Sequence, residues 1–162
     1  MKILIFGIVA SGKITLFREL SLQYNIPCYE GDSIAWDHEC KNNYKRSDLE
    51  QLNIILDIDK NGDWIIEGTY RESQKCLFDM ADKIIFLDTP LYIRKIRIIT
   101  RFIKQKLGIE KCNYNPTFDM LKKMFQWTKS FENKRSKYEN ILSSYEDKLI
   151  RIKSTKELQG KL

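Results

Sequence analysis

The 162-residue sequence predicts a single α/β domain, a three-layer, doubly wound fold with five parallel strands and helices on both faces of the sheet. Short apolar runs, typical of buried strands, alternate with longer segments that carry apolar residues at helical spacing. The first run, Lys2–Phe6, continues through a loop with a glycine at each end into a helical segment. The composition, 43% hydrophobic and 31% charged, is that of a globular chain with one core.

The expected strands and helices alternate along the whole chain. The strands are expected at residues 2–6, 26–29, 64–66, 84–87 and 149–152. The helices are expected at residues 14–24, 47–61, about 74–80, 91 onward and about 117–145. A capping box from Ser47 to Glu50 marks one helix start, and Asn61-Gly62 marks the end of that helix. We expect residues 30–46 to form a loop and Ser154 to cap a final short helix.

Residues Gly7–Lys13 have the spacing of a phosphate-binding loop, or P-loop: glycine, four residues, glycine and lysine. A loop that leads into a helix start directs successive backbone N–H groups at one point, and the helix dipole adds positive potential there. The two glycines allow backbone approaches that a side chain would block, and Lys13 would reach the β- and γ-phosphates of a nucleotide. The residues expected to hold the nucleotide are Gly7, Ala10, Ser11, Gly12, Lys13, Ile14 and Thr15.

Two positions depart from the usual P-loop pattern. Ile14 follows the lysine, where a Ser or Thr hydroxyl would bind Mg²⁺. Thr15 points about 100° further round the helix, so it is better placed for an α-phosphate than for the metal. Ala10 occupies a position that is glycine in many such loops. The alternative is a strand, turn and helix with a chance Gly-Lys pair; we favour nucleotide binding over it, and the departures bear on catalysis more than on binding.

The charge distribution and the cysteine content limit which partners and which cellular compartment the sequence predicts. Residues 94–137 contain thirteen Lys and Arg against three acidic residues, which indicates an anionic partner for this segment. No apolar run approaches the roughly 20 residues of a membrane span, and the N-terminus does not resemble a signal peptide, so we expect no membrane partner. The four cysteines are widely spaced without a CxxC motif, as in reduced thiols of a cytoplasmic protein. The single histidine, His38, is expected to be a solvated loop residue.

The motifs, taken in order, resemble the P-loop proteins called DNA topology modulation proteins, a branch of the adenylate-kinase-like nucleotide kinases. They are the P-loop, then Asp32 and Trp36, WIIEGTY at 64–70, IIFLDTP at 84–90, Arg97 and Arg101, and KKMFQWTKSFENKRSKY at 122–138. The resemblance covers nearly the whole chain. The sequence departs from the family at Ala10 and Ile14, and at Glu67, where the family usually has aspartate.

The resemblance implies a P-loop NTPase fold with a short basic helical lid, at about residues 94–137, over the phosphates. It implies that Mg²⁺ and ATP are bound and that the γ-phosphate is transferred to a nucleoside, nucleotide or similar small acceptor. In such transfer the protein mainly positions the reactants and surrounds the equatorial oxygens with cations. Lys13 and the loop amides would hold the donor.

Five further residues have expected roles, each with a simpler alternative. Glu67 would position the metal through water, or would be a strand-end acid facing solvent. Asp32 would accept the acceptor's hydroxyl proton or hydrogen-bond to it, or would only cap a loop. Arg97 and Arg101 share a helix face and are candidates for a phosphate clamp, or for a solvated face. Trp36 would stack on an acceptor ring, or would fill a loop base.

Two other functions compete with phosphoryl transfer. Basic residues interleave with Phe125, Trp127, Phe131 and Tyr138, and a basic surface with aromatic residues can bind nucleic acid by backbone attraction and base stacking. The other competitor is a degenerate switch that binds nucleotide with little turnover. We favour the kinase because the P-loop is the more specific signal and because a lid that closes on a triphosphate explains the same charge.

Overall fold

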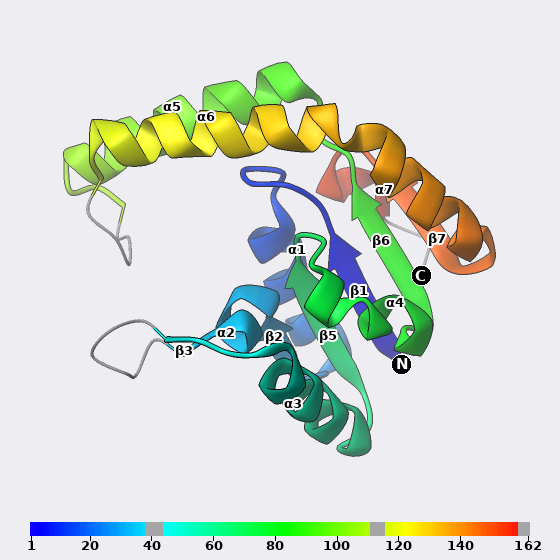
Figure 1. The fold of residues 1–162 in the computed structure, drawn as a ribbon. Helices are drawn as coiled ribbons and strands as arrows, with labels where there is room; N and C mark the ends of the chain where they lie inside the picture. Colours follow the sequence, from blue (N-terminus) through cyan, green and yellow to red (C-terminus); the bar gives the residue numbers. More distant parts are fainter. Residues whose placement is uncertain (38–43, 111–115, 159–162) are drawn as a thin grey trace.

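The computed structural model describes residues 1–37, 44–110 and 116–158. Its centre is a five-stranded sheet in the order β2-β5-β1-β6-β7, and every neighbouring pair of strands is parallel (Figure 1). The strands are β1 (Lys2–Phe6), β2 (Cys28–Glu30), β5 (Trp64–Gly68), β6 (Lys83–Leu87) and β7 (Leu149–Ile152). The predicted five-stranded parallel sheet is confirmed.

Helices connect these strands, and a two-stranded antiparallel ribbon lies outside the main sheet. The helices are α1 (Lys13–Tyr24), α2 (Gly31–Ala35), α3 (Asp48–Lys60), α4 (Cys76–Met80), α5 (Leu91–Lys106), α6 (Phe118–Asn133) and α7 (Arg135–Leu142). The 3-10 turns are η1 (Glu72–Gln74), η2 (Ser143–Lys148) and η3 (Thr155–Leu158), and the ribbon consists of β3 (Trp36–Asp37) and β4 (Tyr44–Lys45). The segments expected near 74–80 and after Ser154 are therefore short helical pieces.

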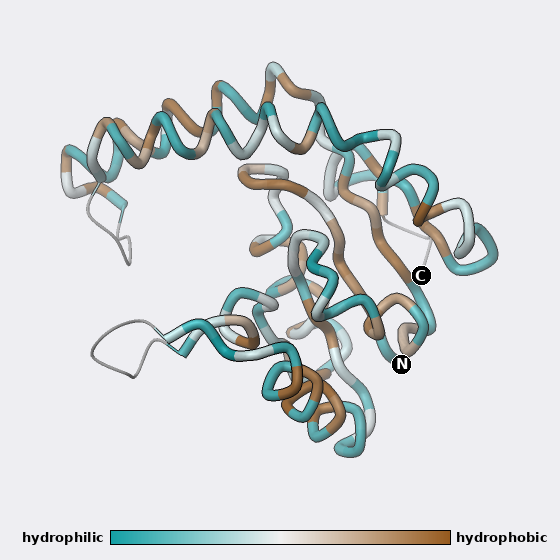
Figure 2. The backbone as a smooth tube through the Cα atoms, in the orientation of Figure 1, coloured by the Kyte–Doolittle hydropathy of each residue, from teal (hydrophilic) through white to brown (hydrophobic). Residues whose placement is uncertain are grey.

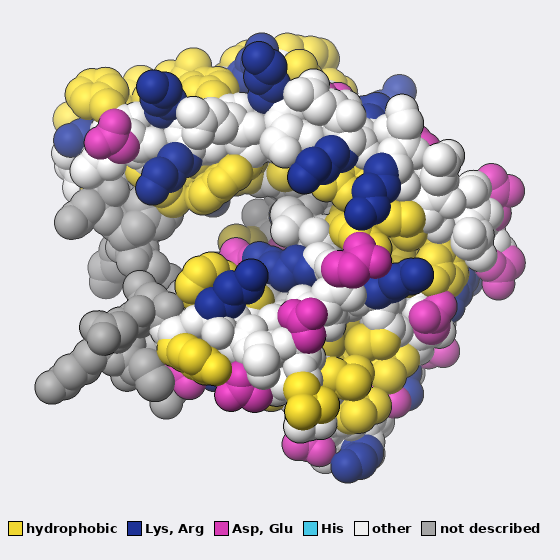
Figure 3. Space-filling view, in the orientation of Figure 1, with side chains coloured by type: hydrophobic (Ala, Val, Ile, Leu, Met, Phe, Trp, Pro, Cys, Tyr) yellow, Lys and Arg dark blue, Asp and Glu magenta, His cyan; other side chains and the backbone are white. Residues whose placement is uncertain are grey.

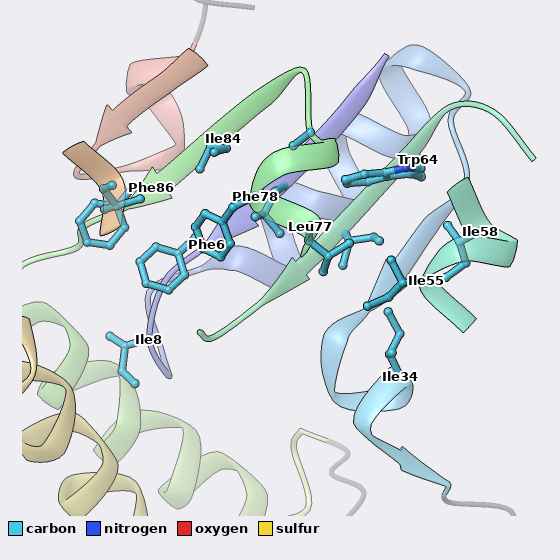
Figure 4. Packing of buried hydrophobic residues seen from close by; sticks show 14 of the residues in the cluster. Phe6, Ile8, Ile34, Ile55, Ile58, Trp64, Leu77, Phe78, Ile84 and Phe86 are labelled. Carbon is cyan, nitrogen blue, oxygen red and sulfur yellow. The ribbon is translucent and has the colours of Figure 1, made fainter. Parts of the chain in front are cut away.

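The central strands β1, β5 and β6 are buried on both faces of the sheet, which explains why they are largely apolar without alternation (Figure 2). Ile3 and Ile5 belong to a cluster covered by α1 and η3, whereas Leu4 and Phe6 belong to the cluster on the opposite face. Side chains of α3, α4 and α6 cover this second face, where Phe6 packs against neighbouring aromatic rings (Figure 4). The molecule thus has three layers, as predicted.

Local signals placed the ends of α3 correctly. The Ser47 side chain accepts a hydrogen bond from the Glu50 backbone, and the Glu50 carboxylate accepts one from the Ser47 backbone. These two bonds satisfy backbone donors that the first turn of a helix leaves open. The helix ends at Asn61, and Gly62 follows with a φ of 105° that favours glycine.

Two predicted segments are wrong in detail. The helix expected over residues 117–145 is two helices, because Lys134 leaves helical geometry at φ −99° and ψ 8°. The break turns the chain so that α7 lies beside the sheet near β7 (Figure 1). The rings of Phe131 and Tyr138 stack across the break with their centroids 4.8 Å apart. The helical spacing of apolar residues therefore continues through the break, and the sequence gives no sign of it. The loop expected over 30–46 contains the short helix α2 and the β3–β4 ribbon.

Other features of the sequence analysis can be located only in part. Cys28 and Cys76 are free thiols, whereas His38, Cys40 and Cys112 lie outside the described residues. Within the described residues, no helix combines the length and apolar character that crossing a bilayer requires. The cytoplasmic location stays a prediction.

We expect Ser47→Ala to lower the free energy of unfolding by about 1 kcal/mol, because the Glu50 backbone N–H loses its acceptor on the Ser47 side chain, whereas the bond from the Ser47 backbone to the Glu50 carboxylate remains. Urea denaturation monitored by circular dichroism measures this. The matched control is Ser130→Ala at an exposed position inside α6, where the same change should alter stability by less than about 0.5 kcal/mol. Equal losses in the two variants would contradict the assignment of the cap.

Candidate functional site

The carboxyl ends of the parallel strands bring distant segments together at one edge of the sheet. Ile5 of β1 is in register with Glu67 of β5, and Glu67 is in register with Glu30 of β2. On the other side of β1, Phe6 is in register with Phe86 of β6. The P-loop after β1 therefore lies between the ends of β5 and β6, where ligands bind in open α/β sheets.

The P-loop backbone requires small residues at three positions. A side chain at Gly7 would place its Cβ 3.0 Å from the Leu87 carbonyl oxygen and 3.1 Å from Ser11 Oγ. Gly12 has a φ of 106°, which L side chains rarely adopt. Ala10 also lies in the left-handed region, at φ 60°, which explains why this position accepts glycine so readily in P-loops. The glycines at 7 and 12 are thus dictated by close approach and by backbone conformation.

Lys13 is buried at the start of α1, and its ammonium group faces the interior of the loop. Its Nζ donates a hydrogen bond to the Ile8 carbonyl at 3.0 Å and lies 3.7 Å from Glu67 Oε2. Burial lowers the pKa of Lys13, and the nearby Glu67 carboxylate partly opposes this effect. Burial likewise raises the pKa of Glu67, with Lys13 opposing. An anion bound beside Lys13 would relieve its desolvation and favour its charged form.

Ser11 has a hydroxyl that lacks a partner and a carbonyl that has several. Its Oγ is buried without a hydrogen-bond partner among the described residues, close to the position that a Gly7 side chain would fill. Its carbonyl accepts from Arg97 Nη1 at 2.7 Å and lies 2.9 Å from the Thr89 hydroxyl. The Ser11 carbonyl is thus bonded to residues outside the loop. The Ser11 hydroxyl has a donor hydrogen that a ligand oxygen could accept.

The structure separates the two arginines that the sequence placed on one helix face. Arg97 of α5 reaches the P-loop, where its Nη1 donates to the carbonyls of Ala10 and Ser11. Arg101, one turn further along α5, instead forms an ion pair with Glu110 at 3.0 Å. Arg97 is thus at the loop, whereas Arg101 would have to leave Glu110 to contact a phosphate.

Arg94 anchors α5 to the end of β6, a role that sequence reasoning missed. Its side chain is fully buried, its Nε donates to the Thr89 carbonyl at 2.9 Å, and its guanidinium pairs with Glu132 of α6. Asp88 accepts two hydrogen bonds from Arg135 of α7, at 2.9 and 3.1 Å. The sequence shows Arg94 only as one of many basic residues, and a buried ion pair between separate helices has no local signature.

Asp32 lies on the other side of the site and pairs with Arg71, which follows β5. Both side chains act electrostatically on Lys13 and on Glu67, so the four charged groups form one cluster. The Arg71 Nη1 is buried without a partner among the described residues. Trp36 is partly exposed beyond α2. The sequence placed Asp32 near the P-loop but did not identify its pairing with Arg71.

A hollow separates the α5–α6 pair from the part of the molecule that carries α2 and β4 (Figure 3). The P-loop at the end of β1 points toward this space, and Arg97 reaches the loop from the α5 side. The basic segment predicted as a short lid is therefore a pair of 16-residue helices that projects beyond the edge of the sheet.

The residues at the site suit a polyphosphate well, but they offer few direct ligands for Mg²⁺. Ile14 is 38% exposed and supplies no oxygen, and Thr15 is exposed on α1. Within the described part of the chain, no group of three or more acidic, His or Cys side chains could enclose a metal ion. Mg²⁺ usually keeps several waters and takes one or two carboxylates together with substrate phosphates. Glu67 fits such a water-mediated arrangement.

The aromatic residues that would support nucleic-acid binding are mostly inside the molecule. Phe131 is buried, and Tyr138 packs against the same core cluster as Phe6. Phe125 is partly buried, while Trp127 is exposed on α6. Bases could not stack on Phe131 without unfolding the core, so the structure removes part of the support for this function.

Comparisons with solved structures match the chain to P-loop kinases. It is similar to an uncharacterized protein from Eubacterium ventriosum, with 20% identity, a TM-score of 0.53, and coverage of 94% of this chain and 88% of that one. It is also similar to shikimate kinase from Bacteroides thetaiotaomicron, with 15% identity, a TM-score of 0.51, and coverage of 86% and 82%. A third similar structure is deoxyadenosine kinase from M. mycoides with bound dATP, with 17% identity, a TM-score of 0.50, and coverage of 96% of this chain and 92% of that one.

These similarities establish the fold, an α/β P-loop NTPase fold of the type found in kinases. No protein-family model matches the sequence, and no curated protein matches it significantly. The finer resemblance to the DNA topology modulation proteins therefore stays a prediction.

We expect the double variant Lys13→Met/Glu67→Gln to be at least as stable as the wild type at pH 7, because it removes two buried charges together. Lys13→Met alone should be about 3 kcal/mol less stable than the double variant, because Glu67 stays buried without its counter-charge. Urea denaturation of the three proteins measures these differences. A single variant as stable as the double one would contradict the coupling.

The same proteins test the direction of the pKa shift. The folded-state pKa of Glu67 lies above its unfolded value, so its protonated form favours folding. The free energy of unfolding of Lys13→Met should therefore be highest below the unfolded pKa of a carboxyl and should fall as the pH rises through the folded one. In the double variant this fall should be absent. A fall of equal size in both variants would assign it to other groups.

Proposed function

We propose that this protein is a phosphotransferase that transfers the γ-phosphate of ATP to a nucleoside, nucleotide or similar small acceptor. The observation that carries the proposal is the Gly7–Lys13 loop at the end of β1, with the buried Lys13 ammonium directed at its interior. A buried cation in a loop that leads into a helix start is a site for a dense anion. A second substrate would bind in the hollow beside the loop (Figure 3).

On the donor side, the P-loop amides and Lys13 would bind the β- and γ-phosphates. The Ser11 hydroxyl, buried without a partner, would donate to a phosphate oxygen. Arg97 would keep the loop in shape through the Ala10 and Ser11 carbonyls, and it would turn toward the transferred group as α5 closes. Arg101 joins it only if its ion pair with Glu110 opens.

On the acceptor side, Asp32 would receive the proton of the attacking hydroxyl. Its ion pair with Arg71 orients the carboxylate. Trp36 is exposed near the same end of α2 and would contact the acceptor ring. Magnesium bound with ATP would neutralise charge on the phosphates, and Glu67 would hold it through water.

A second candidate function is a nucleotide-binding switch with little turnover, which Ile14 specifically favours. The helix position that follows the P-loop lysine carries an exposed aliphatic side chain in place of a hydroxyl. Such a site would retain phosphate binding through Lys13 and the amides, and it would lose the direct protein ligand of the metal. Turnover stimulated by an acceptor separates the two candidates.

ADP release from ATP and Mg²⁺, measured with a panel of nucleosides and nucleotides, tests the proposal. We expect one class of acceptor to stimulate release, Lys13→Ala to lower the stimulated rate by about 1000-fold, and Asp32→Asn to lower it by about 100-fold. The matched control is Lys60→Ala, which removes an exposed lysine at the end of α3 and should leave the rate unchanged. ATP binding without stimulation by any acceptor would favour the switch.

We expect Ile14→Ser to increase the rate at low Mg²⁺ concentration by about 10-fold, because it supplies the hydroxyl ligand that the site lacks. The exposed position makes the substitution compatible with folding. The measurement is the ADP release rate as a function of Mg²⁺ concentration. Leu22→Ser, another exposed apolar residue of α1, is the control. An unchanged Mg²⁺ dependence in Ile14→Ser would show that position 14 does not limit metal binding.

A further inference from the structure

The outer face of α5 carries an exposed apolar stripe that the proposed reaction does not use. Tyr92, Ile96, Ile99 and Ile103 recur at helical spacing, and Ile99 and Ile103 are 45% and 50% exposed. Exposed single apolar residues are common, but four on one helix face form a continuous surface. We call this set the α5 stripe.

The stripe is a second apolar face of α5, separate from the one that attaches the helix to the protein. Arg94, Ile98 and Gln105 are the buried residues of the helix, and they lie on the side opposite the stripe. That side faces α6 and the end of β6, to which Arg94 is bonded. The apolar residues of the stripe are therefore not needed to hold α5 in place.

Lysines flank the stripe on both sides. Lys95 and Lys106 lie along one edge, Lys104 lies beyond Thr100 on the other side, and α5 contains no acidic residue. Lys106 also lies over the rings of Phe102 and Phe118, 5.9 Å from each centroid. An apolar centre flanked by lysines, on a helix without acidic residues, is complementary to a surface that is apolar inside and anionic at its edge.

Three kinds of occupant could cover such a face, and they differ in chemistry. A nucleic-acid backbone would meet the lysines but would gain nothing from burying aliphatic isoleucines. A second copy of this chain would cover the apolar residues but would bring its own lysines against these, with no acid on either α5 to pair with them. A lipid surface with anionic headgroups satisfies both the lysines and the isoleucines.

The place of α5 in the molecule fits contact with an extended surface. The α5–α6 pair lies along one side of the protein, and hydrophobic side chains line its outer edge (Figures 1 and 3). The hollow and the P-loop open on the inner side of the same pair. A surface that meets the stripe therefore leaves the P-loop accessible.

From these observations we propose that the outer face of α5 binds anionic lipid membranes peripherally, with the stripe entering the headgroup region. This revises the sequence-based expectation of no membrane partner, which depended on the lack of a spanning segment. A basic amphipathic helix of low overall hydrophobicity lies in the interface and does not span the bilayer. The proposal is independent of the phosphotransferase activity.

Co-sedimentation of the full chain with vesicles tests the proposal. The wild type should bind phosphatidylcholine vesicles that contain phosphatidylserine, and it should bind pure phosphatidylcholine vesicles far less. Ile99→Asp/Ile103→Asp should weaken binding at least about 10-fold. Lys95→Ser/Lys104→Ser should weaken it about 5-fold for each lysine removed and should leave the stripe intact. Leu22→Asp, at an 85% exposed position on α1, is the matched control and should bind as the wild type does.

Circular dichroism checks that each variant is folded. If Ile99→Asp/Ile103→Asp does not fold, Lys95→Ser/Lys104→Ser still tests the proposal. Failure of the wild type to bind anionic vesicles would overturn the proposal, and so would equal binding by the wild type and both variants. A wild-type dimer in light scattering that Ile99→Asp/Ile103→Asp converts to a monomer would assign the stripe to a second copy. Competition by duplex DNA for the lysines, without any effect of the aspartates, would assign it to nucleic acid.

Discussion

At the end of β1, the ammonium group of Lys13 is buried against the Ile8 carbonyl and lies 3.7 Å from the Glu67 carboxylate. Taking a cation out of water costs several kcal/mol. The attraction to Glu67, whose own pKa is raised by burial, offsets only part of this cost. The arrangement is therefore incomplete without a further negative charge. A loop that leads into a helix start is a general site for such a charge, so the cost of burying Lys13 indicates what the site is built to bind.

The loop around Lys13 keeps its shape because other elements hold its outer side. Arg97 and Thr89 bond to the Ser11 carbonyl, and Arg94 bonds to the Thr89 carbonyl. The same α5 helix thus connects the P-loop to β6 and, through the pair between Arg94 and Glu132, to α6. Movement of the α5–α6 pair would consequently displace the loop carbonyls. Lid closure and phosphate binding would be coupled through these hydrogen bonds.

The sequence predicted the features that depend on neighbouring residues and missed those that depend on distant ones. The capping box at Ser47 and the glycines of the P-loop are local, so their positions could be predicted. The break at Lys134 was hidden because the apolar period continues across it. The pair between Asp32 and Arg71 joins residues 39 apart in the chain, and no sequence pattern marks it. In the sequence Arg94 is one basic residue among many, and it is buried because two separate segments supply its partners, Thr89 and Glu132.

Calorimetric titration of the folded protein with ATP, with and without Mg²⁺, tests most directly whether Lys13 and the P-loop amides form a polyphosphate site. We predict binding by the wild type and at least about 100-fold weaker binding by Lys13→Met/Glu67→Gln, which lacks the cation and which we expect to fold. Failure of the wild type to bind ATP or GTP under any of these conditions would contradict it, as would equal binding by the two proteins.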